Sequence, residues 1–330
     1  MILQPCFPRS QAGVSSIDIS VRVACLAART SLQETRYGMK TRYVKRHVRA
    51  FWLFVAPCLL LFSTFFLIPL GLSVGFSFTN YDGWKVMNFI GLANYKELFA
   101  DTKFYQSLGR TFAYTLFSLP FKVIIPLLIA SLVTSKRVKI KALARTLTYI
   151  PSLLSALVVG ITINWMFSAE YGLVNYVIQV LGGTPLQWAL NPKLATFVIS
   201  FASNWASTGF YMVIFIGGLN NIPQEMYEAA AIDGSTTMQT FLRITIPMLA
   251  PTTFLVTLLS TVNLLKEYAL VQGITQGGPG LNTTFIIQFI FDKGFNQMQY
   301  GYASAISLVV MVVFAFIAFV QFKFSNGGDR

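Results

Sequence analysis

Long apolar runs are the feature that most limits how this chain can fold. Crossing the hydrocarbon core of a bilayer takes an α-helix of about 20 mostly apolar residues. Six segments meet this requirement, at 51–78, 108–134, 143–167, 194–219, 247–270 and 302–322. Only 11% of the 330 residues are charged, against about a quarter in soluble domains. We therefore predict an all-α membrane protein, a bundle of six transmembrane helices over residues 51–325.

Two further apolar segments lie between the predicted spans, at 173–183 and 284–295. Each is interrupted and too short to cross, so we expect helices that lie in the outer interface of the membrane. If either were a span, the orientation of every later segment would be reversed. Prolines such as Pro57, Pro120 and Pro126 predict kinked or tilted spans, which a bundle tolerates when neighbouring helices supply hydrogen-bond partners.

Basic residues in the short loops predict the orientation of the spans. Segment 36–49 holds six Lys and Arg residues and no acid, and segment 135–145 holds five and no acid. In contrast, segment 79–107 balances three lysines against three acids. The positive-inside rule then places both termini in the cytoplasm, together with residues 220–246. The net charge of +13 is explained by this topology, so we expect no nucleic-acid partner.

The ends of the chain are predicted to lie outside the bundle. Residues 1–50 are expected to form a partly disordered cytoplasmic tail, and residues 326–330 a short one. The apolar part of the first tail contains Asp18 and Arg22 and is too short to span. It also lacks the order of a signal peptide, and Met39 is an alternative start.

The chain is poor in residues that carry catalysis or hold metals. Its one histidine, His47, lies in a basic segment beside the first span, and Cys6, Cys25 and Cys58 share no ligand spacing. No Gly-x4-Gly-Lys-Ser/Thr run is present to cradle ATP phosphates. We therefore expect a chain that is not an enzyme and that has no catalytic, metal-binding or cofactor-binding residues.

The segment 221–246 is neither a span nor a charged tether. It reads NIPQEMYEAAAIDGSTTMQTFLRITI. Asn221 is the predicted N-cap of a helix with Pro223 in its first turn, and Gly234 is expected to end that helix. A second short helix is predicted over 238–243. Taken alone, these features fit an ordinary, well-capped connection equally well.

The spacing within this segment resembles the EAA motif of the permease subunits of binding-protein-dependent ABC importers. Three residues separate Glu-Ala-Ala from a glycine, and nine more precede an Ile-x-x-Pro sequence. The matching residues are Glu228, Ala229, Ala230, Gly234, Ile244 and Pro247. The one departure is Ile246, which stands where leucine is usual.

Other stretches extend the resemblance over residues 50–325 to the carbohydrate permeases of the maltose-type group. They include SFTNYDGW (77–84), RTLTYIPSLLSALVVG (145–160), TQGGPGLNTT (275–284) and GYASAISLVV (301–310). The resemblance implies one half of a channel in a bacterial inner membrane. Its implied partners are a second homologous permease, two ATPase subunits that hold ATP and Mg, an extracytoplasmic binding protein, a carbohydrate substrate and membrane lipid. The EAA segment would dock on the ATPase as a coupling helix.

Polar residues inside the predicted spans provide a candidate substrate pathway, because such residues normally face the interior of a bundle. Polar side chains recur at helical spacing in segments 194–219 and 247–270, and tryptophans nearby could stack on sugar rings. The candidates are Lys122, Asn164, Trp165, Asn204, Trp205, Thr208, Tyr211, Ser260, Asn263, Lys266 and Glu267. Packing of helices through small polar residues is an equally good explanation.

Lys122 is the most informative of these residues. It lies 13 residues from the inner end of the second span, roughly 20 Å deep at ~1.5 Å per residue. We therefore expect it to face a wet cavity or an anionic partner, whereas Lys266 has a neighbouring acid, Glu267, with which to pair. The two lysines favour an acidic oligosaccharide, such as an alginate or pectin fragment. A neutral sugar bonded by Lys122 is equally compatible.

Three other functions remain open from the sequence. An ATP-independent channel or secondary transporter would need a mid-membrane carboxylate or an internal repeat, and Glu267 lies near the outer end of its span. An ABC permease could carry amino acids or peptides in place of sugar. A membrane enzyme would need a catalytic constellation within the spans, which the sequence does not indicate.

Overall fold

A computed structural model describes residues 51–84, 87–135 and 140–326. Within these ranges the chain is helical apart from turns, loops and one isolated bridge between Thr79 and Phe89. The predicted tail at 1–50 and the final residues 327–330 lie outside the described residues. The chain divides into two compact units, residues 1–71 and 72–330, and each is described by itself.

The described part of the first unit is the beginning of a single helix, Phe51–Ser77, which continues into the second unit. A π-helical turn, η1 (Ser63–Leu67), interrupts it, and α2 (Ile68–Ser77) follows. Pro69 stands at the second position of α2. Because proline lacks an amide hydrogen and crowds the preceding turn, a wider turn at this place relieves the conflict.

In the second unit, α2 is followed by α3 (Ala93–Ala100) and α4 (Thr102–Thr134). Asp101 separates these helices and caps α4, since its Oδ1 accepts a hydrogen bond of 2.8 Å from the Lys103 amide. The capped start explains why α4 begins earlier than the predicted span at 108. Pro120 and Pro126 both lie inside α4 without ending it.

The third predicted span is broken. It consists of α5 (Lys141–Tyr149), the 3₁₀ turn η2 (Ile150–Leu153) and α6 (Ala156–Met166), with a bend of 99°. The prediction of one helix over 143–167 is therefore wrong. Pro151 cannot donate the backbone hydrogen bond that would carry α5 forward, and Leu154 adopts an extended conformation. The helix α7 (Leu173–Val180) follows within the first of the two short apolar segments.

The fourth predicted span is one continuous helix, α8 (Pro192–Asn220). After it come α9 (Gln224–Ile232), α10 (Thr237–Thr240), the π-helical turn η3 (Phe241–Thr245) and α11 (Ile246–Met248). The fifth span is α12 (Ala250–Leu265), bent by 68° from the segment Thr237–Met248.

The predicted end of the fifth span at residue 270 is wrong, because α12 ends at Leu265 and α13 (Ala269–Ile274) is a separate helix. At the break, Glu267 Oε1 accepts a hydrogen bond from the Leu270 amide at 3.3 Å. A side-chain acceptor therefore replaces a backbone carbonyl of the interrupted helix. The chain ends with α14 (Ile286–Phe291), the π-helical turn η4 (Asp292–Asn296) and α15 (Tyr300–Asn326).

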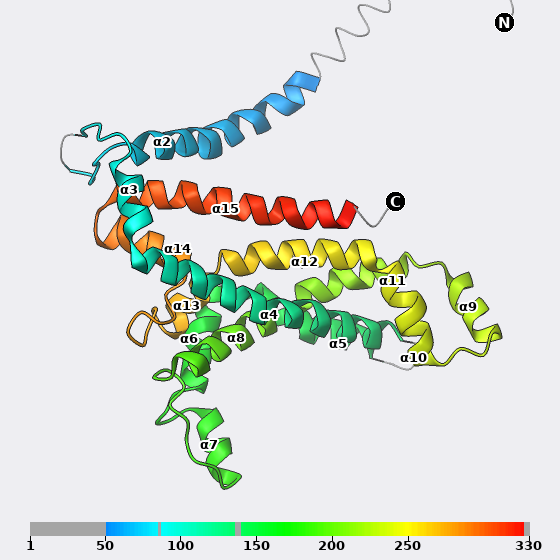
Figure 1. Cartoon of the computed structure of the whole chain (residues 1–330). Helices are drawn as coiled ribbons and strands as arrows, with labels where there is room; N and C mark the ends of the chain where they lie inside the picture. The colour runs from blue at the N-terminus through cyan, green and yellow to red at the C-terminus, as the bar shows by residue number, and fades with distance from the viewer. Residues whose placement is uncertain (1–50, 85–86, 136–139, 327–330) are drawn as a thin grey trace, which may run out of the picture. The chain divides into compact units, whose positions relative to one another are not determined.

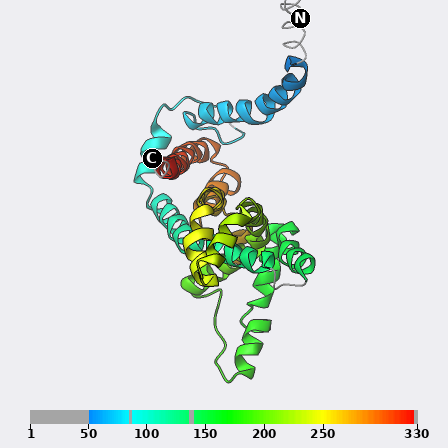
Figure 2. The same ribbon diagram turned by 90° about the vertical axis from the view of Figure 1, so that its right-hand side faces the viewer.

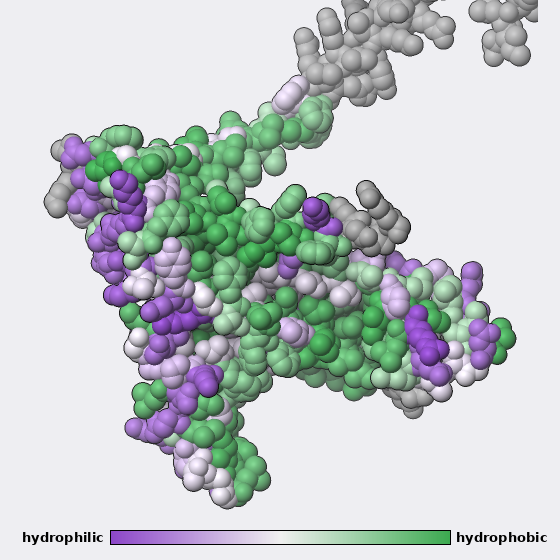
Figure 3. Space-filling view, viewed as in Figure 1, coloured by the Kyte–Doolittle hydropathy of each residue, from purple (hydrophilic) through white to green (hydrophobic). Residues whose placement is uncertain are grey.

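Within the second unit, α4, α8, α12 and α15 run alongside one another (Figures 1 and 2). The short helices α9, α10 and α11 lie at one end of this bundle, and α3, α13 and α14 lie at the other (Figure 1). Apolar side chains cover much of its length, and hydrophilic ones gather at the two ends (Figure 3). This is the pattern of a bundle that spans a bilayer.

The described residues contain four helices long and apolar enough to cross a membrane, or up to six if each bent pair is one span. The predicted fold class, a helical membrane bundle, is confirmed, although two of its six spans are broken. Buried side chains form separate clusters along the bundle. The cluster nearest α9 includes Phe215 and Leu249, and the cluster nearest α13 includes Tyr114 and Val271.

Candidate coupling segment and candidate substrate pathway

The inner segment, named for the side of the membrane that the sequence predicts for it, comprises residues 221–248. Its first helix, α9, begins two residues later than the sequence predicts. Asn221 is not an N-cap, because its amide is bonded back to Gly218 at 3.1 Å as the C-cap of α8. An N-cap needs an extended backbone, and Asn221 is in the helical region whereas Pro223 is extended. Pro223 therefore precedes the first turn of α9.

Gly234 ends the exit turn of α9 in the left-handed conformation, with φ of +73°. The Ser235 amide then reaches back to the Ala230 carbonyl at 2.9 Å, which is a common way to close a helix C-terminus. No atom lies within 4 Å of a Cβ built at Gly234. Glycine is therefore needed for its backbone conformation and not for space.

The second short helix differs from the predicted 238–243. Thr236 and Gln239 form a capping box at the start of α10, and η3 then takes over from Phe241. The Ile246 amide reaches the Phe241 carbonyl, one residue further than in an α-helix. Pro247 has no amide hydrogen to donate to the preceding turn. The wider π-helical turn therefore lies where the α-helical hydrogen-bond pattern would be interrupted.

The six residues of the motif do not share one surface. Glu228, Ala229, Gly234 and Pro247 are exposed, Ile244 is half-buried and Ala230 is buried. Successive residues of a helix point about 100° apart, so Ala229 and Ala230 cannot both face outward. The outward surface of the inner segment also carries large apolar side chains, namely Met226, Ile232, Met238 and Leu242.

The inner segment is joined firmly to the long helices. Tyr227 packs against the buried cluster that includes Phe215 and Leu249, and its hydroxyl lies 3.3 Å from Thr245 Oγ1. Ile222 is buried in the same cluster. The segment thus combines a solvent-facing apolar surface with anchors on both α8 and the start of α12. A partner that moved it would move those helices as well.

A buried polar network connects α4, α8 and α12. Lys122 is 2% exposed, and its Nζ donates to Asn263 Oδ1 at 3.0 Å. Ser118 and Ser200 join α4 to α8, with 2.7 Å between their hydroxyl oxygens. Glu267, 8% exposed, accepts from Ser203 Oγ at 3.3 Å. Several predicted pathway residues therefore meet inside the subunit.

The face of α8 that carries Ser200, Ser203, Asn204, Thr208 and Tyr211 is buried, as expected for helices that pack through polar residues. Asn204 Oδ1, on this side of the bundle, is buried without a hydrogen-bond partner. Such atoms are uncommon in native structures. The side chain of Asn204 also lines the cavity described next, whereas that of Ser260 is enclosed between helices.

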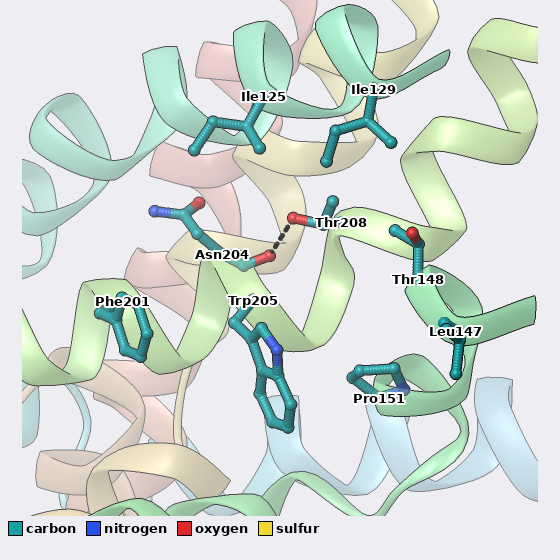
Figure 4. A pocket seen from close by; sticks show the side chains of 9 residues that line it. All are labelled: Ile125, Ile129, Leu147, Thr148, Pro151, Phe201, Asn204, Trp205 and Thr208. Carbon is teal, nitrogen blue, oxygen red and sulfur yellow. Dashed lines mark hydrogen bonds between the residues drawn. The ribbon is translucent and has the colours of Figure 1, made fainter. Parts of the chain in front are cut away.

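A cavity of about 420 Å³ lies beside this network (Figure 4). Its walls come from α4, from α5 with η2, and from α8. The lining residues are Ile125, Ile129, Leu147, Thr148, Pro151, Phe201, Asn204, Trp205 and Thr208. Three predicted pathway residues, Asn204, Trp205 and Thr208, are therefore brought together at one cavity.

The other predicted pathway residues lie elsewhere. Lys122, Tyr211, Ser260 and Glu267 are buried between helices and do not line the cavity, and Asn263 bonds Lys122. Asn164, Trp165 and Lys266 are exposed. The expected pairing of Lys266 with its neighbour Glu267 is wrong, because the carboxylate turns inward to Ser203.

Six cavity residues are absent from the sequence-based candidates. Ile125, Ile129, Leu147 and Phe201 are apolar residues in apolar segments, so nothing in the sequence distinguishes them from lipid-facing ones. Thr148 and Pro151 line the cavity because α5 and η2 pack against α8. Among the described residues, no group of three or more His, Cys, Asp or Glu could hold a metal ion.

These features define a multi-pass membrane subunit with a polar interior and a protruding, firmly anchored connection at one end. Residues 90–326 match the family described as binding-protein-dependent transport system inner membrane component, and the chain belongs to this family. The predicted resemblance to ABC importer permeases is thereby confirmed. The chain is a transport subunit of the inner membrane.

Relatives and solved structures agree with this assignment. The chain is 34% identical over 280 residues to the arabinooligosaccharides transport system permease protein AraP of Bacillus subtilis, covering 83% of this chain and 88% of that protein. It is 32% identical over 276 residues to the lactose transport system permease protein LacF of Rhizobium radiobacter, covering 82% and 92%.

Among solved structures, the fold is similar to a chain of a bacterial ABC transporter involved in the import of the acidic polysaccharide alginate. The TM-score is 0.75 with 21% identity, and the match covers 86% of this chain and 98% of that one. At this identity the likeness extends to the fold and not to the cargo.

Proposed function

We propose that this chain passes an oligosaccharide from an extracytoplasmic binding protein across the inner membrane, driven by ATP hydrolysis on separate subunits. The observation that carries the proposal is the similarity, over most of both chains, to permeases for arabinooligosaccharides and lactose. A cavity that combines Asn204 and Thr208 with the aromatic Trp205 supports a carbohydrate. Sugars present hydroxyl groups for hydrogen bonds and apolar ring faces for contact with aromatic side chains.

The proposed complex contains a second homologous permease, two ATPase subunits and the binding protein. ATP and Mg are held by the ATPase subunits, and this chain binds neither. Both termini and the inner segment are proposed to be cytoplasmic, on the basis of the basic loops at 36–49 and 135–145.

The inner segment is proposed to be the contact with one ATPase. Glu228, Ala229 and Gly234 are exposed on it, next to apolar side chains such as Ile232. An exposed apolar surface with a polar rim is typical of a protein interface. The packing of Tyr227 and Ile222 on the long helices provides a route by which closure of the ATPases shifts α8 and α12. Ala230, Ile244 and Pro247 support the shape of the segment.

The test is reconstitution of the complete complex in proteoliposomes, with ATP inside and the loaded binding protein outside. Neutral cargo should include arabino-oligosaccharides, malto-oligosaccharides and lactose, and acidic cargo should include alginate and oligogalacturonate fragments. We expect uptake of at least one oligosaccharide that stops when the ATPase subunits are omitted.

Two results would contradict the proposal. Uptake by this chain without any ATPase would indicate a secondary transporter or channel. Uptake of amino acids or peptides, with no uptake or receptor binding of any oligosaccharide in the panel, would contradict the proposed oligosaccharide substrate. It would leave the proposed ATP-driven mechanism unchanged.

A further inference from the structure

A series of aromatic rings lies at the end of the bundle that carries α3 and α14, opposite the inner segment (Figure 1). Each ring centroid lies within 6.0 Å of the next. In order, the rings are those of Phe76, Tyr81, Tyr300, Phe295, Phe291 and Tyr268. They come from segments far apart in the sequence, namely α2 and the loop after it, the break between α12 and α13, α14, η4 and α15. We call this set the aromatic series.

Two rings of the aromatic series are exposed. The side chain of Phe295 is 59% exposed and that of Phe291 is 38% exposed, whereas the other four are half-buried. The half-buried part is closely packed, because a Cβ built on Gly83 would lie only 2.8 Å from the ring of Tyr300. The exposed rings therefore rest on a fixed base, and a ligand that covers them has little ordering cost to overcome.

Oriented amide groups lie beside the exposed rings. Within η4, Asp292 accepts hydrogen bonds from Asn296 Nδ2 at 2.9 Å and from Gln297 Nε2 at 2.7 Å. The carboxylate thereby fixes the direction of both amides. Their carbonyl oxygens bond no other group among the described residues and are exposed, so they remain available as acceptors. The surface around Phe295 thus combines aromatic rings with hydrogen-bonding groups.

This combination favours one kind of ligand. Lipid tails can cover aromatic rings, but they offer no hydrogen bond to the amide oxygens beside them. A sugar residue presents both an apolar ring face and hydroxyl groups, so it matches both parts of the surface. Neighbouring ring centroids are 4.8 to 6.0 Å apart, which is comparable with the length of one sugar residue. An extended oligosaccharide can therefore contact more than one ring.

We propose that Phe291, Phe295 and Tyr300, together with Asn296 and Gln297, form a capture site for an oligosaccharide at the outer end of the permease. The sugar lies with its ring faces against the aromatic side chains, and its hydroxyl groups donate to the amide oxygens. The nature of the cargo and the outward orientation of this end rest on the proposed function. The capture site goes beyond it, because it is a second place of contact, separate from the cavity between α4, α5 and α8.

The test is binding of free oligosaccharides to the complete complex in nanodiscs, measured by saturation-transfer NMR without the binding protein. The probes are arabino-oligosaccharides, malto-oligosaccharides, lactose, and alginate and oligogalacturonate fragments. We expect saturable binding of at least one probe to the parent complex. Phe295→Leu keeps an apolar side chain but removes the flat ring, so it should weaken that binding about fivefold, whereas Phe295→Trp should stay within about twofold of the parent.

Phe99→Leu is the matched control, because Phe99 of α3 is also 59% exposed and lies outside the aromatic series. It should leave binding within about twofold of the parent. A second variant, Gln297→Ala, removes one amide without changing a ring and should weaken binding about threefold. All three side chains are exposed, so the melting temperature should not change in any of these variants.

Equal binding by the parent, Phe295→Leu and Phe99→Leu would overturn the proposal, as would the absence of saturable binding of every probe. Weaker co-purification of the binding protein or the second permease with Phe295→Leu, at unchanged sugar binding, would show a protein interface. Quenching by brominated lipid of the fluorescence added in Phe295→Trp would show a membrane contact. If the complex imports no oligosaccharide but Phe295→Leu still weakens binding of a probe, the proposed function fails and the capture site is supported.

Discussion

The inner segment and the buried polar network place their key residues in opposite surroundings. Glu228 and Ile232 point into solvent at the end of the bundle, whereas Lys122 and Glu267 are enclosed between three helices. An exposed residue has water as its alternative partner, so replacing it changes mainly what another protein can bind. A buried charge has only its neighbours, so replacing one partner disturbs the helices themselves.

The two regions are nevertheless connected through α8. Tyr211 and Phe215 of α8 are buried in the cluster beside the inner segment, and Ser203 of the same helix bonds Glu267 near the other end. A rigid helix that contacts both regions can transmit a displacement from one to the other. This comparison predicts two kinds of variant. Changes in the inner segment should uncouple the ATPase and leave the fold intact, whereas changes in the buried network should lower both the stability of the fold and the coupling.

The largest effect is expected from Lys122→Ala. It removes a side chain that is only 2% exposed and that donates a hydrogen bond to Asn263 Oδ1. Truncating a buried side chain of this size leaves a cavity and typically destabilises a protein by about 2–5 kcal/mol. Uptake should fall more than tenfold, equally for neutral and acidic oligosaccharides. The measurements are thermal unfolding of the purified complex and uptake in proteoliposomes. A normal melting temperature would place Lys122 with the exposed residues and break the comparison.

The next largest effect is expected from Gly234→Val. A β-branched residue at φ of +73° is strained by about 1–2 kcal/mol, so the exit from α9 should change course. The permease should still insert, while co-purification of the ATPase and uptake fall about tenfold. Gly182→Val is the matched control, because Gly182 also has positive φ and open space around it.

Gly182 belongs to the loop after α7, far along the chain from the inner segment. Its replacement should carry a similar strain and leave ATPase binding intact. Equal loss of ATPase in both variants would mean that backbone strain anywhere in the subunit is sufficient, and the special role of Gly234 would be rejected.

A smaller effect is expected from Trp205→Ala at the cavity. Losing an aromatic wall should raise the substrate concentration needed for half-maximal uptake about fivefold, at the scale of ~1 kcal/mol for a ring contact. Phe210→Ala is the control on the same helix, since Phe210 is similarly exposed but does not line the cavity. If both variants behave alike, Trp205 contributes only to the surface of α8.

The smallest effect is expected from Ile232→Ser. Ile232 is 86% exposed, so the melting temperature should not change. Affinity for the ATPase should weaken about threefold, because burying about 25 Å² of apolar surface is worth roughly 0.6 kcal/mol. Leu181→Ser, at a side chain that is 81% exposed in the loop after α7, provides the comparison. Titration of labelled ATPase onto the permease in nanodiscs measures the difference. A shift in melting temperature would mean that Ile232 supports the fold.

The sequence predicted these two regions to different extents. The inner segment could be recognised because its signal is local, an ordered spacing from Glu228 to Pro247. The exact helix boundaries could not be predicted in the same way. The N-cap of α9 is Pro223 and not the predicted Asn221, because α8 extends further than predicted. Helix length depends on packing as well as on local residues.

The buried network could be predicted only in part. Polar residues in spans 194–219 and 247–270 were identifiable because such residues avoid lipid. Their partners were not, since Lys122 bonds a residue 141 positions away. Lys266 and Glu267 are adjacent in the chain, yet one is exposed and the other is buried.

The sequence by itself determined the class of fold, the approximate location of the spans and the family. These depend on hydrophobicity summed over about 20 residues and on spacing within short motifs, both of which are local properties. Only the tertiary structure decided where the third and fifth spans break, which polar side chains bond to one another, and which apolar residues form the cavity. Those outcomes depend on which faces of separate helices pack together, and that packing cannot be predicted from a local pattern in the sequence.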